Sequence, residues 1–275
     1  MNAKRTVQGR LMGALAKRSA VELAAEAAGA VLDGTEVEAI DQVIVGQVLT
    51  AGTGWCAGQQ LVVKLGLPLA TPGYGVNMAC ASGLLSVALA AQTIRSGEAD
   101  VILCGGTESM SNAPYLLDRA GGKLGDRTLA DAILRDALVD TFHLEHMGVT
   151  AERLAEQFSL SRQSQDAYAV QSQQRAGAAH EAGLFADELV AVDDLDRDEH
   201  ARPGTTPEQL ASLRPAFARD GTVTAGNASG INDGAAMLLV CDEATADREG
   251  WCKLARIVAS ASAKRHPPKD DTVHF

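Results

Sequence analysis

The 275-residue sequence contains no apolar run that approaches the ~20 residues a membrane-spanning helix needs. Its basic start, Met1 to Arg5, is not followed by the apolar core of a signal peptide. The sequence also lacks a CxxC pair, because its five cysteines are scattered at positions 56, 80, 104, 241 and 252. That spacing argues against a disulfide framework or a zinc site. These absences predict a cytoplasmic protein with reduced thiols, no bound metal ion and no membrane contact.

Aromatic residues make up only 4% of the chain, and basic residues are outnumbered by acidic ones. The 24 Lys and Arg against 35 Asp and Glu give a net charge of −11, which repels a nucleic-acid backbone, so we expect no nucleic-acid partner. By contrast, 46% of the residues are hydrophobic and 27 are glycines. This composition favours an α/β fold, in which helices pack closely on a sheet, over an all-β sandwich.

Hydrophobic patterning predicts alternating helices and strands before residue 112. Ser19 and a glutamate three residues later form a capping-box pattern, which predicts a helix from about residue 20 to residue 34. Buried strands are expected over 41–46 and 100–106, with a helix over 58–67 between them. The alternation indicates a sheet with helices packed on it.

The pattern changes after about residue 112, which indicates an insertion. Thr150 and Ser161 are expected to cap a short helix and a longer one. The acid-rich run 193–200 is expected to be a solvated loop. Near the end of the chain, 253–263 has the pattern of one more strand.

The turn between a predicted strand over 73–78 and a predicted helix over 84–94 carries the most chemistry. Cys80 lies in this turn, where the unpaired N–H groups of a helix start favour the thiolate, the nucleophilic form of the thiol. The residues 81–83 are small, which leaves room for a bulky acyl donor. A buried structural role is the alternative for any cysteine, and we favour it for the other four. For Cys80 the setting favours a nucleophile.

Three separated motifs share their sequence and order with one enzyme family. Residues 77–83 read NMACASG, 146–152 read HMGVTAE and 224–236 read TAGNASGINDGAA. Together they closely resemble the motifs of thiolases of the acetyl-CoA acetyltransferase type, and further similar stretches at 105–111 and 198–202 extend the resemblance over nearly the whole chain.

The resemblance implies a fold and a division into domains. Thiolases have a layered αβαβα fold built from two similar α/β halves, with a loop domain inserted in the first half. The chain then divides into a first part of the N-terminal α/β domain (1–112), the inserted loop domain (113–218), the return to the N-terminal domain (219–252) and a stub of the C-terminal domain (253–275). The C-terminal half is therefore expected to be largely missing.

The resemblance also implies roles for five residues. Cys80 matches the cysteine that takes an acyl group from acyl-CoA, and His146 and Met147 match a pair that lines the acyl and pantetheine pocket. Ser229 matches a contact to the pantetheine of coenzyme A, and Arg202 lies in the segment that meets its nucleotide. Without the motifs, the expected roles are structural. His146 is then expected to be a hydrogen-bonded loop histidine, Met147 to fill the core and Arg202 to form a surface ion pair.

The sequence departs from the family in two ways. The strand that usually precedes an Arg-Thr-Pro segment is expected to be missing, since the chain reaches Arg5, Thr6 and Val7 almost at once. The family's second half also supplies an activating histidine in a glycine-histidine-proline motif, an asparagine motif for an oxyanion-hole water and a second cysteine as base. None of these is in the sequence, and we interpret His266 as a loop histidine.

These features predict an acyl-CoA C-acyltransferase that forms or cleaves acetoacetyl-CoA (3-ketoacyl-CoA) through Cys80, with coenzyme A thioesters as substrates and no other cofactor. Losing a catalytic base typically lowers the rate ~10²–10⁴-fold, and losing the oxyanion-hole groups has a similar effect. The chain alone is therefore expected to be inactive. The alternative is a non-catalytic thiolase-like CoA-binding or scaffold subunit. The expected partners are acyl-CoA, copies of the chain in a dimer or tetramer, and a complementary C-terminal polypeptide.

Overall fold

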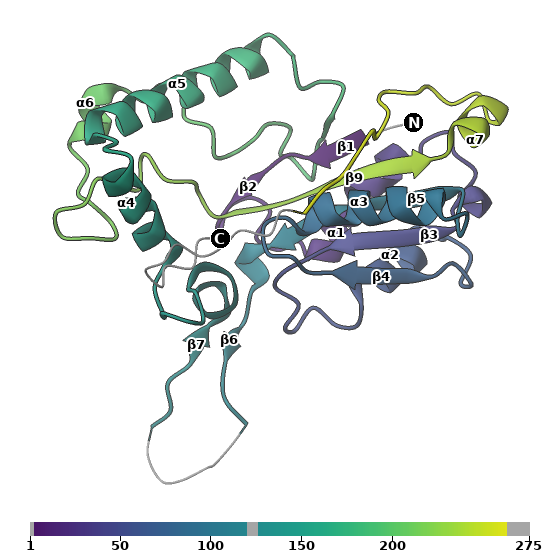
Figure 1. Ribbon diagram of the computed structural model, residues 1–275, viewed down its shortest axis with the longest axis horizontal. Coiled ribbons are helices and arrows are strands. Elements are labelled where there is room, and N and C mark those ends of the chain that lie inside the picture. The colour runs from purple at the N-terminus through teal and green to yellow at the C-terminus, as the bar shows by residue number, and fades with distance from the viewer. Residues whose placement is uncertain (1–2, 120–125, 263–275) are drawn as a thin grey trace.

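A single twisted sheet forms the centre of the molecule. The computed structural model describes residues 3–119 and 126–262 (Figure 1). The sheet has seven strands in the order β4-β3-β5-β9-β1-β8, and β2 pairs with β9. β3 is parallel to β4 and β5, whereas β9 runs antiparallel to β5 and β1. The strands are β1 (Ala3–Thr6), β2 (Gly9–Arg10), β3 (Gln42–Gly46), β4 (Gly73–Val76), β5 (Val101–Ser109), β8 (Leu189–Val190) and β9 (Asn232–Cys241).

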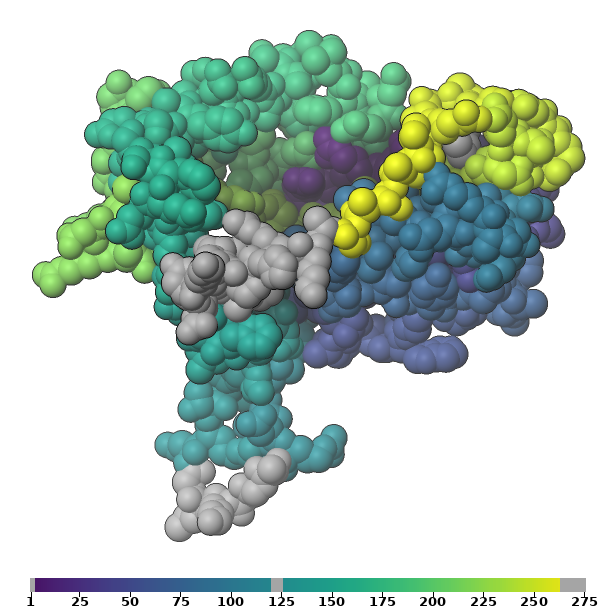
Figure 2. Space-filling view, in the orientation of Figure 1, coloured from purple at the N-terminus to yellow at the C-terminus, as the bar shows by residue number. Residues whose placement is uncertain are grey.

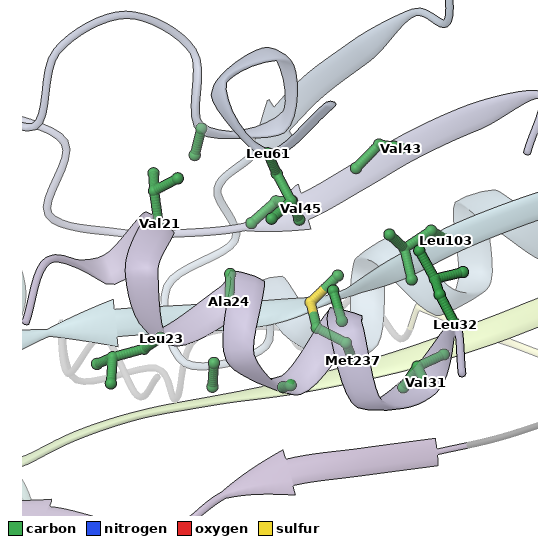
Figure 3. Packing of buried hydrophobic residues seen from close by; sticks show 14 of the residues in the cluster. Val21, Leu23, Ala24, Val31, Leu32, Val43, Val45, Leu61, Leu103 and Met237 are labelled. Carbon is green, nitrogen blue, oxygen red and sulfur yellow. The ribbon is translucent and has the colours of Figure 1, made fainter. Parts of the chain in front are cut away.

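One face of the sheet is covered by α1 (Ala20–Val31) and α2 (Ala57–Lys64). Side chains alternate between the faces of a strand, so Val43, Leu103 and Met237 all point toward these helices. They are 0% exposed and pack with apolar residues of α1 and α2 (Figure 3). We call this side of the sheet the α1 face.

The opposite side, the α3 face, is covered by α3 (Ser82–Arg95). The intervening strand residues Ile44, Ile102 and Cys104 point toward it and are also 0% exposed. The cluster of fully buried residues is smaller here, and several apolar residues of α3 and β4 are only half-buried. Residues 251–262 pass over this side without regular structure (Figure 2).

A long excursion between β5 and β9 extends away from the sheet (Figure 1). It returns once, where β8 pairs in parallel with β1. Its other elements are η2 (Met110–Asn112), β6 (Tyr115–Leu116), β7 (Ala130–Asp131), η3 (Leu134–Leu138), α4 (Met147–Gln157), α5 (Arg162–Glu181) and α6 (Pro207–Ala211). Two short helices lie outside the excursion, η1 (Val37–Ala39) and α7 (Glu243–Arg248).

Most of the expected elements are present. The capping box at Ser19 begins α1, with both reciprocal hydrogen bonds formed, and Ser161 caps α5. The strands expected over 41–46 and 100–106 are β3 and β5, and the helix expected over 58–67 is α2. The α/β class is confirmed.

Two predictions at the chain ends are wrong. A first strand does form, because the backbone of Ala3–Thr6 pairs with both β9 and β8 although its sequence has no apolar alternation. Residues 253–262 do not form the expected strand; a strand needs a hydrogen-bonded partner, and no described strand pairs with this segment. The rest of that stretch and His266 lie outside the described residues.

In the excursion one prediction is wrong and another holds only in part. Thr150 lies inside α4, whose cap is His146, because the His146 side chain accepts the N–H that an N-cap must accept. The acid run is a solvated loop only in part, since residues 193, 194, 196 and 197 are exposed whereas Asp198 and Glu199 are half-buried. Asp193 pairs with Arg18, Asp198 pairs with Arg5, and Glu199 pairs with Arg10, contacts between positions far apart in sequence.

In the part of the chain that the structure describes, no helix has the length and apolar character to cross a membrane.

Candidate active site

Cys80 is solvent-exposed in the turn between β4 and α3, as the sequence predicts. The preceding residue, Ala79, has φ 48°, a left-handed conformation that is unfavourable for a residue with a side chain. Two side chains hold it there. Asn77 Oδ1 accepts from the Ala79 N–H at 3.0 Å, while Ser82 Oγ donates to the Ala79 carbonyl at 2.6 Å. The turn is therefore strained, and it is fixed by its neighbours.

The start of α3 differs from the starts of the other long helices. Its N-cap is Ala81, which provides no side-chain hydrogen bond, whereas Ser19 caps α1 and Ser161 caps α5. No polar side chain therefore competes for the positive end of the α3 dipole next to Cys80. That this end favours the Cys80 thiolate stays a prediction.

Glycines let the start of α3 rest directly on the sheet. A Cβ added at Gly46 at the end of β3 would come within 2.4 Å of the Ser82 carbonyl carbon. A Cβ at Gly106 on β5 would come within 3.0 Å of Gly83 Cα. The nucleophile turn thus sits against backbone, at a distance that only glycine permits.

A cavity of about 430 Å³ opens beside Cys80, a size in the range of small-molecule sites. Its walls come from distant parts of the chain. They include the loop after β3 at Gln47 and Val48, the end of β5 at Glu108, and residues 136–138 of η3. Residues 232–236 of β9, which belong to the third thiolase-like motif, complete the wall. The sheet therefore brings two of the three motifs to one cavity.

Glu108 is a polar member of this wall that the sequence analysis did not single out. Burial raises the pKa of its carboxyl group, although the group also accepts hydrogen bonds from backbone N–H groups. Its Oε2 accepts from the Val48 N–H at 2.9 Å and from the Leu49 N–H at 3.2 Å. The available signal was an acidic residue near the end of a strand whose first residues are apolar.

His146 and Met147 do not line the cavity beside Cys80. His146 is half-buried, its Nδ1 accepts from the Gly148 N–H at 3.0 Å, and its ring stacks on Phe217 with 4.7 Å between centroids. Met147, at the first position of α4, is 38% exposed. Their roles in acyl and pantetheine binding stay predictions.

Arg202 and Ser229 also lie outside that cavity, and both are exposed. Among the described residues the Arg202 guanidinium makes no ion pair, and its backbone N–H donates to Gln173 Oε1 at 2.7 Å. The segments that carry them meet, however. His200 Nδ1 lies 3.1 Å from Asn232 Nδ2, and a Cβ on Gly230 would overlap the His200 ring. Asn232 lines the cavity, so both segments reach its edge.

The geometry matches known proteins over nearly the whole chain. Residues 1–244 match the family model described as "Thiolase, N-terminal domain". The acetyl-CoA acetyltransferase of Rhizobium meliloti (strain 1021) is 47% identical over 277 residues, covering 97% of this chain and 70% of that relative. The chain belongs to the thiolase family. An acetyl-CoA acetyltransferase of Escherichia coli (strain K12) is 46% identical and covers 95% of this thiolase chain and 70% of its own length.

Solved thiolase structures have the same fold. Human mitochondrial 3-ketoacyl-CoA thiolase in complex with CoA is 42% identical, with a TM-score of 0.90 over 94% of this chain and 67% of that one. The Bacillus anthracis acetyl-CoA acetyltransferase gives a TM-score of 0.90 at 36% identity, over 94% and 68% of the two chains. These matches confirm the thiolase fold, and the chain spans about 70% of the length of the curated relatives cited above.

Proposed function

We propose that Cys80 accepts an acyl group from an acyl-CoA, as the first step of a thiolase-type acyl-CoA C-acyltransferase that forms or cleaves acetoacetyl-CoA. The supporting observation is an exposed cysteine at a strained strand-to-helix turn, beside a cavity whose wall is built by thiolase motifs. The acetyl-CoA acetyltransferase names of the relatives and the CoA in a solved homologue support the same substrate class.

The chemistry at Cys80 is an exchange of thioesters. The Cys80 thiolate attacks the thioester carbonyl of acyl-CoA, the new S–C bond forms and the CoA thiolate leaves. In the synthetic direction the enolate of a second acyl-CoA then attacks the Cys80 thioester and releases the thiol. We include no cofactor other than the CoA thioester itself.

The rest of the cycle requires groups that these 275 residues do not supply. The histidine, asparagine and second-cysteine motifs of the family's second half are absent from the sequence. Among the described residues that line the cavity, the titratable side chains are Arg5, Cys80, Glu108, Asp136 and Asp233, without a histidine. We therefore propose that Cys80 is acylated slowly in this chain and that turnover requires a complementary polypeptide.

Mass spectrometry of the chain incubated with acetyl-CoA tests this proposal. We expect an acetyl group on the Cys80 peptide that hydroxylamine removes, and none on the peptide of Cys252, which is also exposed. The Cys80→Ser variant is expected to lose the acetyl-thioester. Acetoacetyl-CoA thiolysis by the chain alone is expected to stay at background. Unmodified Cys80 after prolonged incubation would contradict the acyl-acceptor role.

The second candidate is a non-catalytic CoA-binding or scaffold subunit, which is favoured by the absence of a histidine from the described cavity wall. The two functions differ in how they depend on Cys80. A scaffold binds CoA equally well as wild type and as Cys80→Ser, in a calorimetric titration, and never becomes acylated. An acyl acceptor binds CoA in both forms but is acylated only as wild type.

Self-association and a complementary C-terminal polypeptide are part of the proposal, because both would cover the α3 face. α3 is apolar on nearly all sides, yet Leu84 is 74% exposed and Leu85, Val87 and Leu89 are only half-buried. An apolar surface of this kind is usually covered by another surface. Light scattering during size-exclusion chromatography is expected to show a dimer or tetramer, and a stable monomer with a sharp melting transition contradicts this part. The five cysteines form no disulfide in the described structure, which supports a cytoplasmic location.

A further inference from the structure

His200 lies where the two segments expected to contact coenzyme A meet, and the proposed reaction gives it no role. Arg202 follows it by two positions, and Ser229 precedes its hydrogen-bond partner Asn232 by three. The His200 ring is half-buried and lies outside the described cavity wall, whereas Asn232 belongs to that wall. His200 therefore connects the cavity with the segments around it.

The backbone that carries His200 is held beside β2. The Glu199 N–H donates to the Gln8 carbonyl at 2.9 Å, and Asp198 Oδ1 accepts from the Gln8 N–H at 2.9 Å. β2 in turn pairs with β9, the strand on which Asn232 lies. These contacts fix the position from which the His200 side chain reaches β9.

The orientation of the Asn232 amide follows from its two neighbours. Asn232 Nδ2 donates to the Gly9 carbonyl at 2.9 Å and lies 3.1 Å from His200 Nδ1. The reversed amide would turn Oδ1 toward the Gly9 carbonyl, with two acceptors facing each other. Nδ2 therefore faces both neighbours. Since an amide nitrogen only donates, His200 Nδ1 is the acceptor in this hydrogen bond.

This hydrogen bond defines the protonation state of the His200 ring. A neutral imidazole carries one proton, so a ring that accepts at Nδ1 carries its proton on Nε2. A doubly protonated ring would point a second N–H at the Asn232 amide and lose the hydrogen bond. The contact therefore requires the neutral Nε2–H tautomer.

The ring also lies against the loop that precedes β9. A Cβ added at Gly230 would come within 1.9 Å of His200 Cε1 and 2.3 Å of His200 Nε2. Gly230 does not have a positive φ, so glycine is needed here for space and not for its backbone conformation. The loop 229–231, which carries Ser229, therefore closes directly onto His200.

We infer that His200 is a positioning residue: as the neutral Nε2–H tautomer it accepts from Asn232 and seats the loop 229–231, so that Ser229 and Arg202 are held in one arrangement toward coenzyme A. The benefit to coenzyme A binding rests on the proposed function, whereas the hydrogen bond and the seating of the loop do not.

Two substitutions separate a hydrogen-bond acceptor from a ring that only fills space. His200→Asn keeps an acceptor but loses bulk, because asparagine Oδ1 is as many bonds from the backbone as histidine Nδ1. His200→Leu keeps bulk but loses the acceptor. In calorimetric titrations with CoA, we expect the Kd of His200→Leu to rise about three- to tenfold and that of His200→Asn to stay within about twofold of wild type. Equal effects, or a larger effect of His200→Asn, overturn the inference.

Nitrogen NMR of the imidazole rings tests the tautomer without CoA. The His200 signals are those missing from the His200→Asn spectrum. At neutral pH we expect a proton on Nε2 and none on Nδ1. In Asn232→Asp the donor becomes an acceptor, so a proton is expected to appear on Nδ1. A protonated Nδ1 in wild type, or a spectrum that Asn232→Asp leaves unchanged, overturns the inference, even where His200→Leu does not fold.

A double-mutant cycle in thermal denaturation tests the seating of the loop, again without CoA. Gly230→Ala places a methyl group where the His200 ring lies, so the melting temperature is expected to fall. In the His200→Ala background that space is open, and the same substitution is expected to lower the melting temperature much less. Equal losses in both backgrounds contradict the seating of the loop by His200.

Failure of the proposed function has a different signature. If wild type does not bind CoA in the titration, the proposed function is overturned, while the NMR and melting experiments still decide the hydrogen bond and the seating of the loop. If wild type, His200→Asn and His200→Leu bind CoA equally well, CoA binding stands and the positioning role of His200 is overturned.

Discussion

The two faces of the central sheet are covered to different extents. On the α1 face, Leu23, Leu61 and Leu103 from two helices and a strand are all 0% exposed, and the apolar cluster is continuous (Figure 3). On the α3 face Ile44, Ile102 and Cys104 are buried, but α3 leaves Leu84 74% exposed. From residue 84 to residue 91, α3 is apolar on nearly all sides, which is typical of a helix inside a protein, yet it lies at a surface. Cys80 lies at the start of this helix.

The end of the described chain gives the α3 face a thin cover. Arg95 Nη2 donates to the Ile257 carbonyl at 2.7 Å, and Ile257 packs against the α3 cluster. Figure 2 shows the segment as a narrow strip across the helix. Val258 beside it remains 82% exposed, so the strip does not replace a packed layer.

The largest expected effect comes from a matched pair of leucine substitutions, one on each face of the sheet. Leu103→Ala in the α1-face core is expected to lower the free energy of unfolding by about 2–5 kcal/mol, because it leaves a cavity. Leu84→Ala on α3 is expected to change it by less than about 0.5 kcal/mol in a dilute sample in which the chain is monomeric, because Leu84 is exposed within a single chain. Urea denaturation monitored by circular dichroism measures both. Equal losses would mean that another surface covers Leu84 in solution.

The ion pair between Arg5 of β1 and Asp198 gives a reference that lies outside both helix-covered clusters. Burial opposes ionisation of Asp198, but hydrogen bonds from Arg5 and the Gln8 N–H outweigh it and lower the pKa of the carboxyl group. Asp198→Asn is expected to cost about 1–3 kcal/mol at neutral pH.

The sign of its pH dependence follows from the lowered pKa. The stabilisation from Asp198 is fully present above the ordinary aspartate pKa of about 3.9 and is lost as pH falls through the lower folded-state pKa. The gap in melting temperature between wild type and Asp198→Asn should therefore close in acid. A gap that widens there would contradict the ion pair with Arg5.

The helix starts of the two faces can be compared through capping. Ser19→Ala removes the capping box of α1 and is expected to cost about 0.5–2 kcal/mol in urea denaturation. The control is Ser96→Ala at the C-terminal end of α3, where an exposed hydroxyl is lost and the change should stay below about 0.5 kcal/mol. A Ser19→Ala effect as small as the control would show that packing alone fixes the start of α1.

The smallest expected effect is on the reactivity of Cys80, next to the start of α3, which has no side-chain cap. Cys80 is expected to react with iodoacetamide about two- to fivefold faster than Cys252, which is exposed but lies outside any helix, because a helix start stabilises an anion by about 0.3–1 kcal/mol. Cys104 should react last, since burial raises its pKa to about 12. Peptide mass spectrometry gives the three rates. Equal rates at Cys80 and Cys252 would remove the basis for an activated thiol.

Local sequence signals predicted the elements that depend on local interactions. The Ser19 capping box, the strand pattern of β3 and the turn at Cys80 each depend on a few adjacent residues, and the motifs predicted the family. Other contacts join positions that are far apart in sequence. Ala3–Thr6 pairs with β8 and β9. The acid run forms ion pairs with Arg5, Arg10 and Arg18. Glu108 was missed for the same reason, since its partners are Gln47, Val48 and Leu49 on another strand's loop.

The glycine contacts under α3 determine which walls of the cavity can be redesigned. At Gly46 and Gly106 any larger residue would push the helix and its cysteine off the sheet, so substitutions there change reactivity before they change the shape of the cavity. The η3 side, at residues 136–138, carries side chains that can be exchanged without touching that contact. An engineer who wishes to admit a different acyl chain should therefore vary the η3 wall and keep the glycine floor.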